Sequence, residues 1–278
     1  MTAVVLEVDA HEGPVYVPDE DALYFTSVPA PEVAIKRLSL ASGEVSVLRM
    51  QANAANGMAL HPDGRLLVCE QGTRSSPARI SLVDRGTGAA DTVVDGWGGL
   101  PLNSPNDVVV KGDGTVWFTD PSYGFLQGFR PAPALGDFVY RHDPRTGETT
   151  VVAEGFDKPN GLAFSPDERI LYVGDSGEQT HRVEAFDVVN GRALTGRRLF
   201  AVIDPGYPDG IKVDAGGLVY VASCRGVQIF APDGSTVGRI AVPGAVNLAF
   251  AGAGRVYVTA DTAVWTATTP DPDPRKEP

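Results

Sequence analysis

The sequence predicts an all-β fold, a six-bladed β-propeller with four antiparallel strands in each blade. Three observations support this prediction. A unit of two short strands joined by a tight turn recurs six times along the 278 residues. Turn-forming residues are abundant, with 32 glycines and 22 prolines, and no segment sustains the 3.6-residue apolar period of a helix. Repeats of four short strands are typical of propeller blades.

Each repeat begins with a polar residue, then has a short apolar run, a turn rich in Pro, Asp and Gly, and a second apolar strand. Four copies are clear: NGMALHPDGRLLVCEQG, NDVVVKGDGTVWFTDPSYG, NGLAFSPDERILYVGDSG and DGIKVDAGGLVYVASCRG. Two are weaker: EGPVYVPDEDALYFTS and VNLAFAGAGRVYVTA. The copies begin at residues 12, 56, 106, 160, 209 and 246, so the steps are 44, 50, 54, 49 and 37 residues. The strand-like segments between copies complete four strands in each period. A β-sandwich or a pair of small barrels is the alternative, and the regular period argues against both.

The sequences of the two ends of the chain indicate how the ring of blades closes. The last repeat is short, and the segment TAVVLEVDA at 2–10 is a spare strand before the first repeat. We expect this strand to pair into the last blade, so that residues 1–267 form a single propeller. The segment 268–278 is rich in proline and charge, and we expect it to be disordered.

The net charge of −12 argues against binding to nucleic acid or to an anionic membrane, because the chain supplies no basic stripe. The first residues lack the basic and apolar regions of a secretory signal, so we expect none, and no apolar run reaches membrane-spanning length. The two cysteines, Cys69 and Cys224, form no C-x-x-C pair, and both are expected to be buried. We therefore expect a cytoplasmic protein, and the oligomeric state stays open.

The first residues of the six repeats should meet at one end of the central channel, because each repeat starts with the innermost strand of its blade. These residues are Glu12, Asn56, Asn106, Asn160, Asp209 and Val246. Five of the six carry a side-chain oxygen, and converging carboxylates repel unless a cation or a proton lies between them. Such a set suits Ca²⁺, suits Mg²⁺ or Mn²⁺ less well, and disfavours Zn²⁺. The alternative is that these residues only cap strand entries, because Asn-Gly and Asp-Gly are common turn dipeptides.

Several of these stretches carry a family resemblance: HEGPVY at 11–16, LNSPNDVVVKGDGTVWFTDPSYG at 102–124, PNGLAFSPDERILYVGDSG at 159–177 and PDGIKVDAGGLVYVAS at 208–223. The chain resembles the SMP-30/gluconolactonase/LRE-like family, most closely its gluconolactonase branch. The resemblance implies a calcium-dependent lactonase. It also implies one divalent cation, usually Ca²⁺ with Mg²⁺, Mn²⁺ or Zn²⁺ as substitutes, held by Glu12, Asn106, Asn160 and Asp209. The family has no ligand at the position of Asn56, which is therefore expected at the rim as a substrate contact.

The predicted chemistry is hydrolysis of a lactone, with a sugar lactone such as glucono-1,5-lactone as the default substrate. The cation would polarise the carbonyl and activate water, with Asp209 as general base or as nucleophile. Two alternatives stay open: a metal-dependent hydrolase of another ester such as a phosphotriester, and a propeller that binds a ligand without chemistry.

The ends of the second strands supply further candidate substrate contacts, namely Asp120, Tyr123, Asp175 and Arg225. Each has a structural alternative, because the two aspartates can orient neighbouring loops, the tyrosine can pack and the arginine can be a solvated charge. The segment GDSG at 174–177 has the letters of a serine-protease nucleophile loop. This segment lies at the end of a second strand, at the same repeat position as the corresponding segments of the other repeats. Its place in the repeat therefore accounts for it, and we do not expect Ser176 to be a nucleophile.

Overall fold

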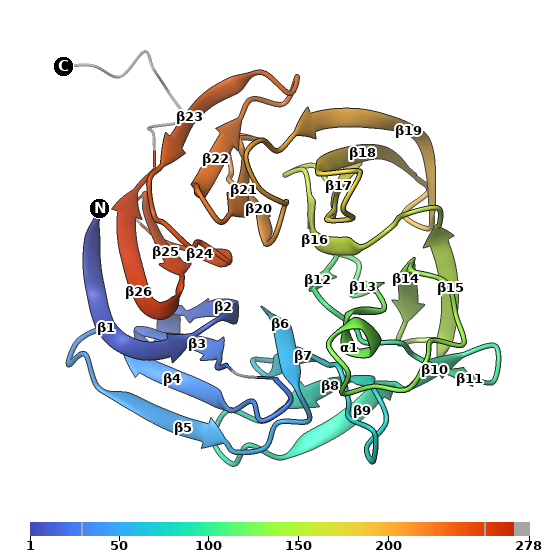
Figure 1. Ribbon diagram of the computed structural model, residues 1–278, viewed down its shortest axis with the longest axis horizontal. Helices are drawn as coiled ribbons and strands as arrows, with labels where there is room; N and C mark the ends of the chain where they lie inside the picture. Colours follow the sequence, from blue (N-terminus) through green and yellow to red (C-terminus); the bar gives the residue numbers. More distant parts are fainter. Residues whose placement is uncertain (29, 253, 270–278) are drawn as a thin grey trace.

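The computed structural model describes residues 1–28, 30–252 and 254–269. Six antiparallel sheets stand in a ring around a central channel (Figure 1). This confirms the predicted six-bladed propeller. Within the described residues, no helix is long and apolar enough to cross a membrane.

Each blade has four strands, and in the first five blades chain order runs outward from the channel. The first three blades are β2 (Glu12–Val17), β3 (Ala22–Thr26), β4 (Ile35–Ser39) and β5 (Val45–Arg49); β6 (Ala55–Leu60), β7 (Leu66–Glu70), β8 (Arg79–Val83) and β9 (Ala90–Val94); and β12 (Val108–Val110), β13 (Val116–Asp120), β14 (Phe138–Asp143) and β15 (Glu148–Ala153).

The next two blades are β16 (Pro159–Phe164), β17 (Ile170–Asp175), β18 (Arg182–Val189) and β19 (Ala193–Val202); and β20 (Ile211–Val213), β21 (Val219–Ser223), β22 (Gly226–Phe230) and β23 (Thr236–Ile240). The sixth blade joins both ends of the chain, as predicted. It contains β24 (Asn247–Ala251), β25 (Arg255–Thr259) and β26 (Asp261–Thr268), and β1 (Thr2–Ala10) pairs antiparallel with β26 as its outer strand. Residues 270–278, most of the segment expected to be disordered, lie outside the described residues.

Few other elements occur in the described part of the chain. A hairpin of β10 (Gly96–Trp97) and β11 (Leu100–Pro101) lies outside the third blade, and the 3₁₀ turn η1 (Pro18–Glu20) joins β2 to β3. A single helical turn, α1 (Tyr123–Leu126), follows β13 and lies over the ring near the channel (Figure 1).

The apolar core is divided among the junctions between blades. One cluster joins Tyr24 of the first blade to Met58 and Val68 of the second, and another joins Trp117 of the third blade to Val173 of the fourth. The second strands are therefore buried on both faces, as in β3, β7, β13 and β21, where every residue is buried. This explains why the second strand of each repeat is a continuous apolar run and does not alternate with polar residues.

Candidate metal and substrate site

A cavity of about 690 Å³ opens at the end of the channel where the innermost strands begin. It is lined by all four predicted metal ligands, Glu12, Asn106, Asn160 and Asp209, and by Asn56. These residues come from five different blades, so the repeat register brings together side chains that are far apart in the sequence. Val246, the first residue of the sixth repeat, is buried and is not among the lining residues described.

Threonine hydroxyls hold the backbone of two of these first residues, Asn160 and Asn56. The hydroxyl of Thr119 donates to the carbonyl of Asn160 in the next blade at 2.8 Å, and the hydroxyl of Thr26 donates to the carbonyl of Asn56 at 3.2 Å. Both threonines lie at or near the end of a second strand. The second strand of one blade therefore positions the start of the first strand in the next.

Glu12 is held by two hydrogen bonds to a single carboxylate oxygen. Asn247 Nδ2 donates to Glu12 Oε2 at 2.7 Å, and the backbone N–H of Gly13 donates to the same atom at 2.8 Å. The side chain is 3% exposed. Since both bonds use Oε2, Oε1 is the oxygen that remains for a ligand.

Three asparagine side chains at the channel mouth have buried amide oxygens without a hydrogen-bond partner among the described residues: Asn56, Asn106 and Asn160. A buried acceptor left unpaired costs about 1–3 kcal/mol, so it calls for an explanation. A cation coordinated by the oxygens of Asn106 and Asn160 would satisfy these two, and the oxygen of Asn56 would remain for a substrate hydroxyl. The donor set of carboxylate and amide oxygens fits a hard divalent ion such as Ca²⁺. No group of three His, Cys, Asp or Glu residues suited to a metal occurs in the described chain, so amide oxygens are an essential part of the candidate set.

The two carboxylates at this site, Glu12 and Asp209, have pKa values above their usual range. Burial raises the pKa of Asp209 to about 7, although the neighbouring Glu12 and Asn160 side chains favour its ionised form. Burial and the charges of Asp209 and Asp107 raise the pKa of Glu12 well above its usual value. A cation bound between the two carboxylates would stabilise the ionised form of both.

Immediately beyond the first residues, glycine occupies four of the six positions, namely Gly13, Gly57, Gly161 and Gly210. The other two positions hold Asp107 and Asn247, whose side chains fill the space that the glycines leave. A Cβ on Gly57 would lie 2.6 Å from Asp107 Oδ1, and a Cβ on Gly210 would lie 2.1 Å from the amide carbon of Asn247. Sequence reasoning missed both residues because it considered only the first position of each repeat.

The predicted substrate contacts divide into two groups. Asn56 and Tyr123 line the cavity. The pKa of the Tyr123 hydroxyl is raised by burial, while Ser176 and Asn160 beside it act in the opposite direction. These two residues therefore stand where a bound substrate would be within reach.

Asp120, Asp175 and Arg225 are not among the described residues that line the cavity. Asp120 is fully buried and accepts the backbone N–H groups of Asn103 and Ser104, each at 2.8 Å. Its partners lie just before Asn106 in the sequence.

Asp175 is also fully buried, and it accepts the N–H of Lys158 at 2.8 Å, just before Asn160. The structure therefore favours the alternative for both aspartates, because they position the loops that carry candidate ligands. Arg225 lies exposed on the β21–β22 turn, as expected for a solvated charge.

Several lining residues were not predicted, namely Gln71, Gln127, Lys158 and Tyr207. Gln71 lies directly after a second strand, so its position in the repeat predicts that it lies near the cavity. The position alone does not indicate that Gln71, and not a neighbouring residue, lines the cavity. The others lie on loops without a repeated position. Cys69 is buried as expected, whereas Cys224 is exposed, because it lies on the β21–β22 turn and not within the strand.

The ring of blades and the oxygen-lined cavity on its axis place the chain in the broad class of propellers with a polar site at the channel mouth. Within that class, a sequence model of the SMP-30/Gluconolactonase/LRE-like region matches residues 10–262. The chain therefore belongs to this family.

Individual relatives agree with the family assignment. A gluconolactonase of Zymomonas mobilis is 31% identical over 257 residues, which cover 85% of this chain and 71% of the relative. The solved structure of XC5397 from Xanthomonas campestris, described as a gluconolactonase, is 36% identical with a TM-score of 0.86 and covers 96% of this chain and 89% of its own. A regucalcin of Agrobacterium tumefaciens, at 22% identity and a TM-score of 0.74 over 92% of this chain and 84% of its own, shares the fold.

Proposed function

We propose that this chain is a lactone hydrolase that depends on a divalent cation, with Ca²⁺ as the preferred ion. Glu12, Asn106, Asn160 and Asp209 would hold the ion. The observation that carries the proposal is the pair of unpaired amide oxygens of Asn106 and Asn160 in one cavity with the buried carboxylate of Glu12 and the half-buried carboxylate of Asp209. Membership of a family with relatives named gluconolactonase supports the choice of lactones.

When bound, the cation would supply a Lewis acid for the lactone carbonyl and stabilise the negative charge that develops on its oxygen. The chain's own groups would move the protons. Asp209 is half-buried and lines the cavity, so it can take a proton from the attacking water. Addition of water to the carbonyl, cleavage of the ring C–O bond and return of the proton to the released alkoxide give the hydroxy acid. In the covalent variant, the Asp209 carboxylate attacks the carbonyl, the ring C–O bond breaks and the released alkoxide takes a proton from water. Hydrolysis of the resulting mixed anhydride by water then gives the hydroxy acid and restores the Asp209 carboxylate.

A sugar lactone such as glucono-1,5-lactone fits the neutral polar groups of the cavity. Asn56, Gln71, Tyr123 and Ser176 supply amide and hydroxyl groups that can bond to sugar hydroxyls. The cytoplasmic location expected from the sequence stays a prediction.

The direct test compares hydrolysis of a broad lactone panel with and without a chelator, followed by re-addition of Ca²⁺. We expect hydrolysis of at least one aldonolactone, loss of activity with the chelator and its return with Ca²⁺. Neutral phosphotriesters belong in the same panel, because a higher kcat/KM for them would support the alternative ester hydrolase. Failure of the cation-loaded protein to hydrolyse any lactone would refute the proposal.

A pair of variants ties the activity to the site. Glu12→Gln removes a charge at the cavity, whereas Glu44→Gln makes the same change at an exposed residue of the β4–β5 turn. We expect the first variant to lose about 100-fold or more in kcat/KM at limiting Ca²⁺ and the second to retain the activity of the unchanged protein. Equal activities in the two variants would exclude Glu12 as a ligand.

A further inference from the structure

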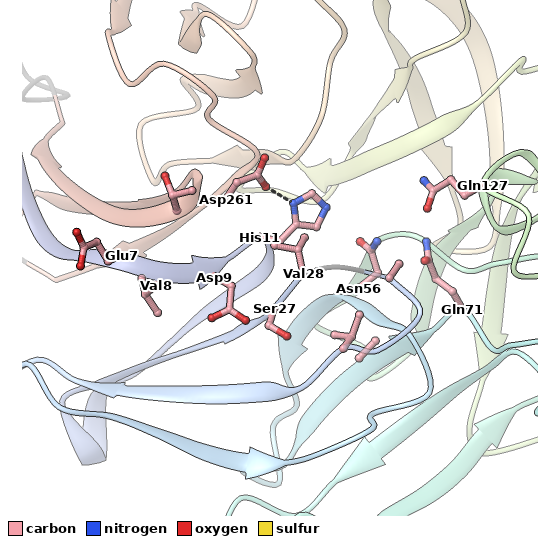
Figure 2. A pocket seen from close by; sticks show the side chains of 14 residues that line it. Glu7, Val8, Asp9, His11, Ser27, Val28, Asn56, Gln71, Gln127 and Asp261 are labelled. Carbon is pink, nitrogen blue, oxygen red and sulfur yellow. Dashed lines mark hydrogen bonds and ion pairs between the residues drawn. The ribbon is translucent and has the colours of Figure 1, made fainter.

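A second cavity, of about 660 Å³, adjoins the candidate site on the side of the first and sixth blades. The two cavities share four lining residues, His11, Asn56, Gln71 and Gln127. A molecule at the candidate site would therefore have room to extend past these side chains. Figure 2 shows the second cavity, with His11 bonded to Asp261 at its edge.

The side chains shared by the two cavities suit hydroxyl groups. Asn56, Gln71 and Gln127 are neutral amides that can both donate and accept hydrogen bonds. The amide oxygen of Asn56 is buried and has no hydrogen-bond partner among the described residues. It is therefore available to accept a hydrogen bond from a ligand hydroxyl between the two cavities. The deeper wall is apolar, with Val8, Val33 and Ala55.

The charges around the two cavities are almost all negative. Glu7, Asp9 and Asp261 line the second cavity, where Asp9 is paired with Lys36 and Asp261 is bonded to His11. Glu12, Asp157, Glu178 and Asp209 line the first. Lys158 is the one lysine or arginine among the described lining residues. It is paired with Asp137 at 3.0 Å and with Asp157 at 3.1 Å, so its charge is already neutralised.

We infer that the second cavity is a subsite for a ring substituent of the lactone, and that it accepts an uncharged hydroxylated substituent and rejects a carboxylate or phosphate. This inference rests on the proposed lactonase function. Neutral hydroxyls replace their bonds to water with bonds to the amides. An anionic substituent would instead lie beside Glu7, Asp9 and Asp261, with no lysine or arginine among the described residues that line this cavity, so like charges would repel it.

The first experiment uses the unaltered protein loaded with Ca²⁺ and compares kcat/KM for two groups of aldonolactones. One group carries a neutral hydroxymethyl or polyol substituent, and the other carries a carboxylate or a phosphate at the same position. We expect a preference of about 100-fold or more for the neutral group. Equal or faster hydrolysis of the anionic group would overturn the inference while leaving the lactonase function intact. Hydrolysis of neither group, together with no hydrolysis of any other lactone in the panel, would refute the lactonase function itself.

The second experiment fills the cavity. Val28 lines it, and Val28→Trp would occupy the space without altering a candidate ligand. The matched control is Val47→Trp, the same change at an exposed position of β5 in the same blade. The measured quantity is the ratio of kcat/KM for a substituted lactone to kcat/KM for an unsubstituted six-membered lactone.

We expect Val28→Trp to lower this ratio by about tenfold or more, because only the substituted lactone needs the second cavity. The control should keep the ratio of the unaltered protein. An unchanged ratio in a folded Val28→Trp protein, verified by its melting temperature, would show that the substituent does not enter the second cavity. If Val28→Trp does not fold, the comparison of neutral and anionic substituents still decides the question.

Discussion

Glu12 shows how one residue at this site depends on its neighbours. Its carboxylate is almost completely buried, and its pKa is raised by burial and by the charges of Asp209 and Asp107. The bonds from Asn247 and Gly13 fix its orientation. The residue is therefore costly to keep ionised in the cation-free protein, and a cation would remove that cost.

Binding of Ca²⁺ should depend on pH as a consequence. The pKa of Asp209 is about 7 in the folded protein and near 3.8 when unperturbed. Below about pH 7 a proton therefore competes with the cation. We expect the affinity measured by calorimetry to fall by up to about tenfold for each pH unit below 7 and to level off above it. An affinity independent of pH between 5 and 8 would contradict these protonation states.

The same pKa shift has a consequence for stability. Because the folded-state pKa of Asp209 lies above the unfolded value, its favourable contribution in the cation-free protein is complete below about pH 4 and is lost as the pH rises through about 7. Addition of Ca²⁺ at 100 times its Kd should add about 2.7 kcal/mol to the free energy of unfolding. Thermal unfolding with and without the cation measures this difference, and at one fixed Ca²⁺ concentration the two melting temperatures should separate more at pH 8 than at pH 5. A separation that grows toward pH 5 would contradict the assignment.

At the level of single residues, the sequence predicted where the candidate ligands would meet but not what each nearby polar residue does. Repeat register was enough to bring Glu12, Asn106, Asn160 and Asp209 to one cavity. The role of Asp120 could not be predicted, because the same strand-end position can face the cavity or bind the preceding loop. Only the coordinates show its two oxygens accepting backbone N–H groups.

The innermost strands are close together because glycine follows the first residue of most repeats. A Cβ on Gly161 would lie 2.2 Å from the carbonyl oxygen of Asp209 in the next blade, a distance that only movement of the backbone could relieve. The glycine therefore determines the spacing between two candidate ligands, Asn160 and Asp209. The sequence predicted these dipeptides as strand entries, but this close approach between blades was visible only in the structure.

The variant Gly161→Ala should both destabilise the protein and weaken cation binding. We expect a loss of about 1–3 kcal/mol in the free energy of unfolding, the usual cost of overpacking, together with a weaker affinity for Ca²⁺. The control Gly238→Ala adds a Cβ on β23 where nothing lies within 4 Å, and its effect should stay within about 0.5 kcal/mol. Denaturant unfolding and calorimetry measure the two quantities. Equal stability of the two variants would show that the inner strands can move apart without cost.

The whole ring is closed by a strand from the other end of the chain. β1 covers the edge of β26, and its buried residues Val8 and Ala10 join the cluster that contains Leu23 and Phe25 of the first blade. The sequence predicted this closure because the last repeat was short and a spare strand stood at the start. The apolar clusters at the blade junctions explain why the ring is complete only when both ends meet.

Removal of residues 1–10 should therefore destabilise the whole molecule. The deletion exposes the edge of β26 and part of the junction between the sixth and first blades, and an exposed edge strand favours aggregation. We expect the melting temperature to fall by at least about 10 °C, with a larger fraction of aggregated protein. Removal of residues 270–278, which belong to the segment predicted to be disordered, is the control and should leave the melting temperature unchanged. A stable monomer without β1 would show that the ring does not need this strand.

The most direct test of the central claim is anomalous diffraction from crystals of the protein grown with Ca²⁺. The account predicts one anomalous peak in the cavity at the channel mouth, about 2.3–2.6 Å from side-chain oxygens of Glu12, Asn106, Asn160 and Asp209. A cavity without a peak at saturating Ca²⁺, or a peak coordinated by other residues, would contradict it.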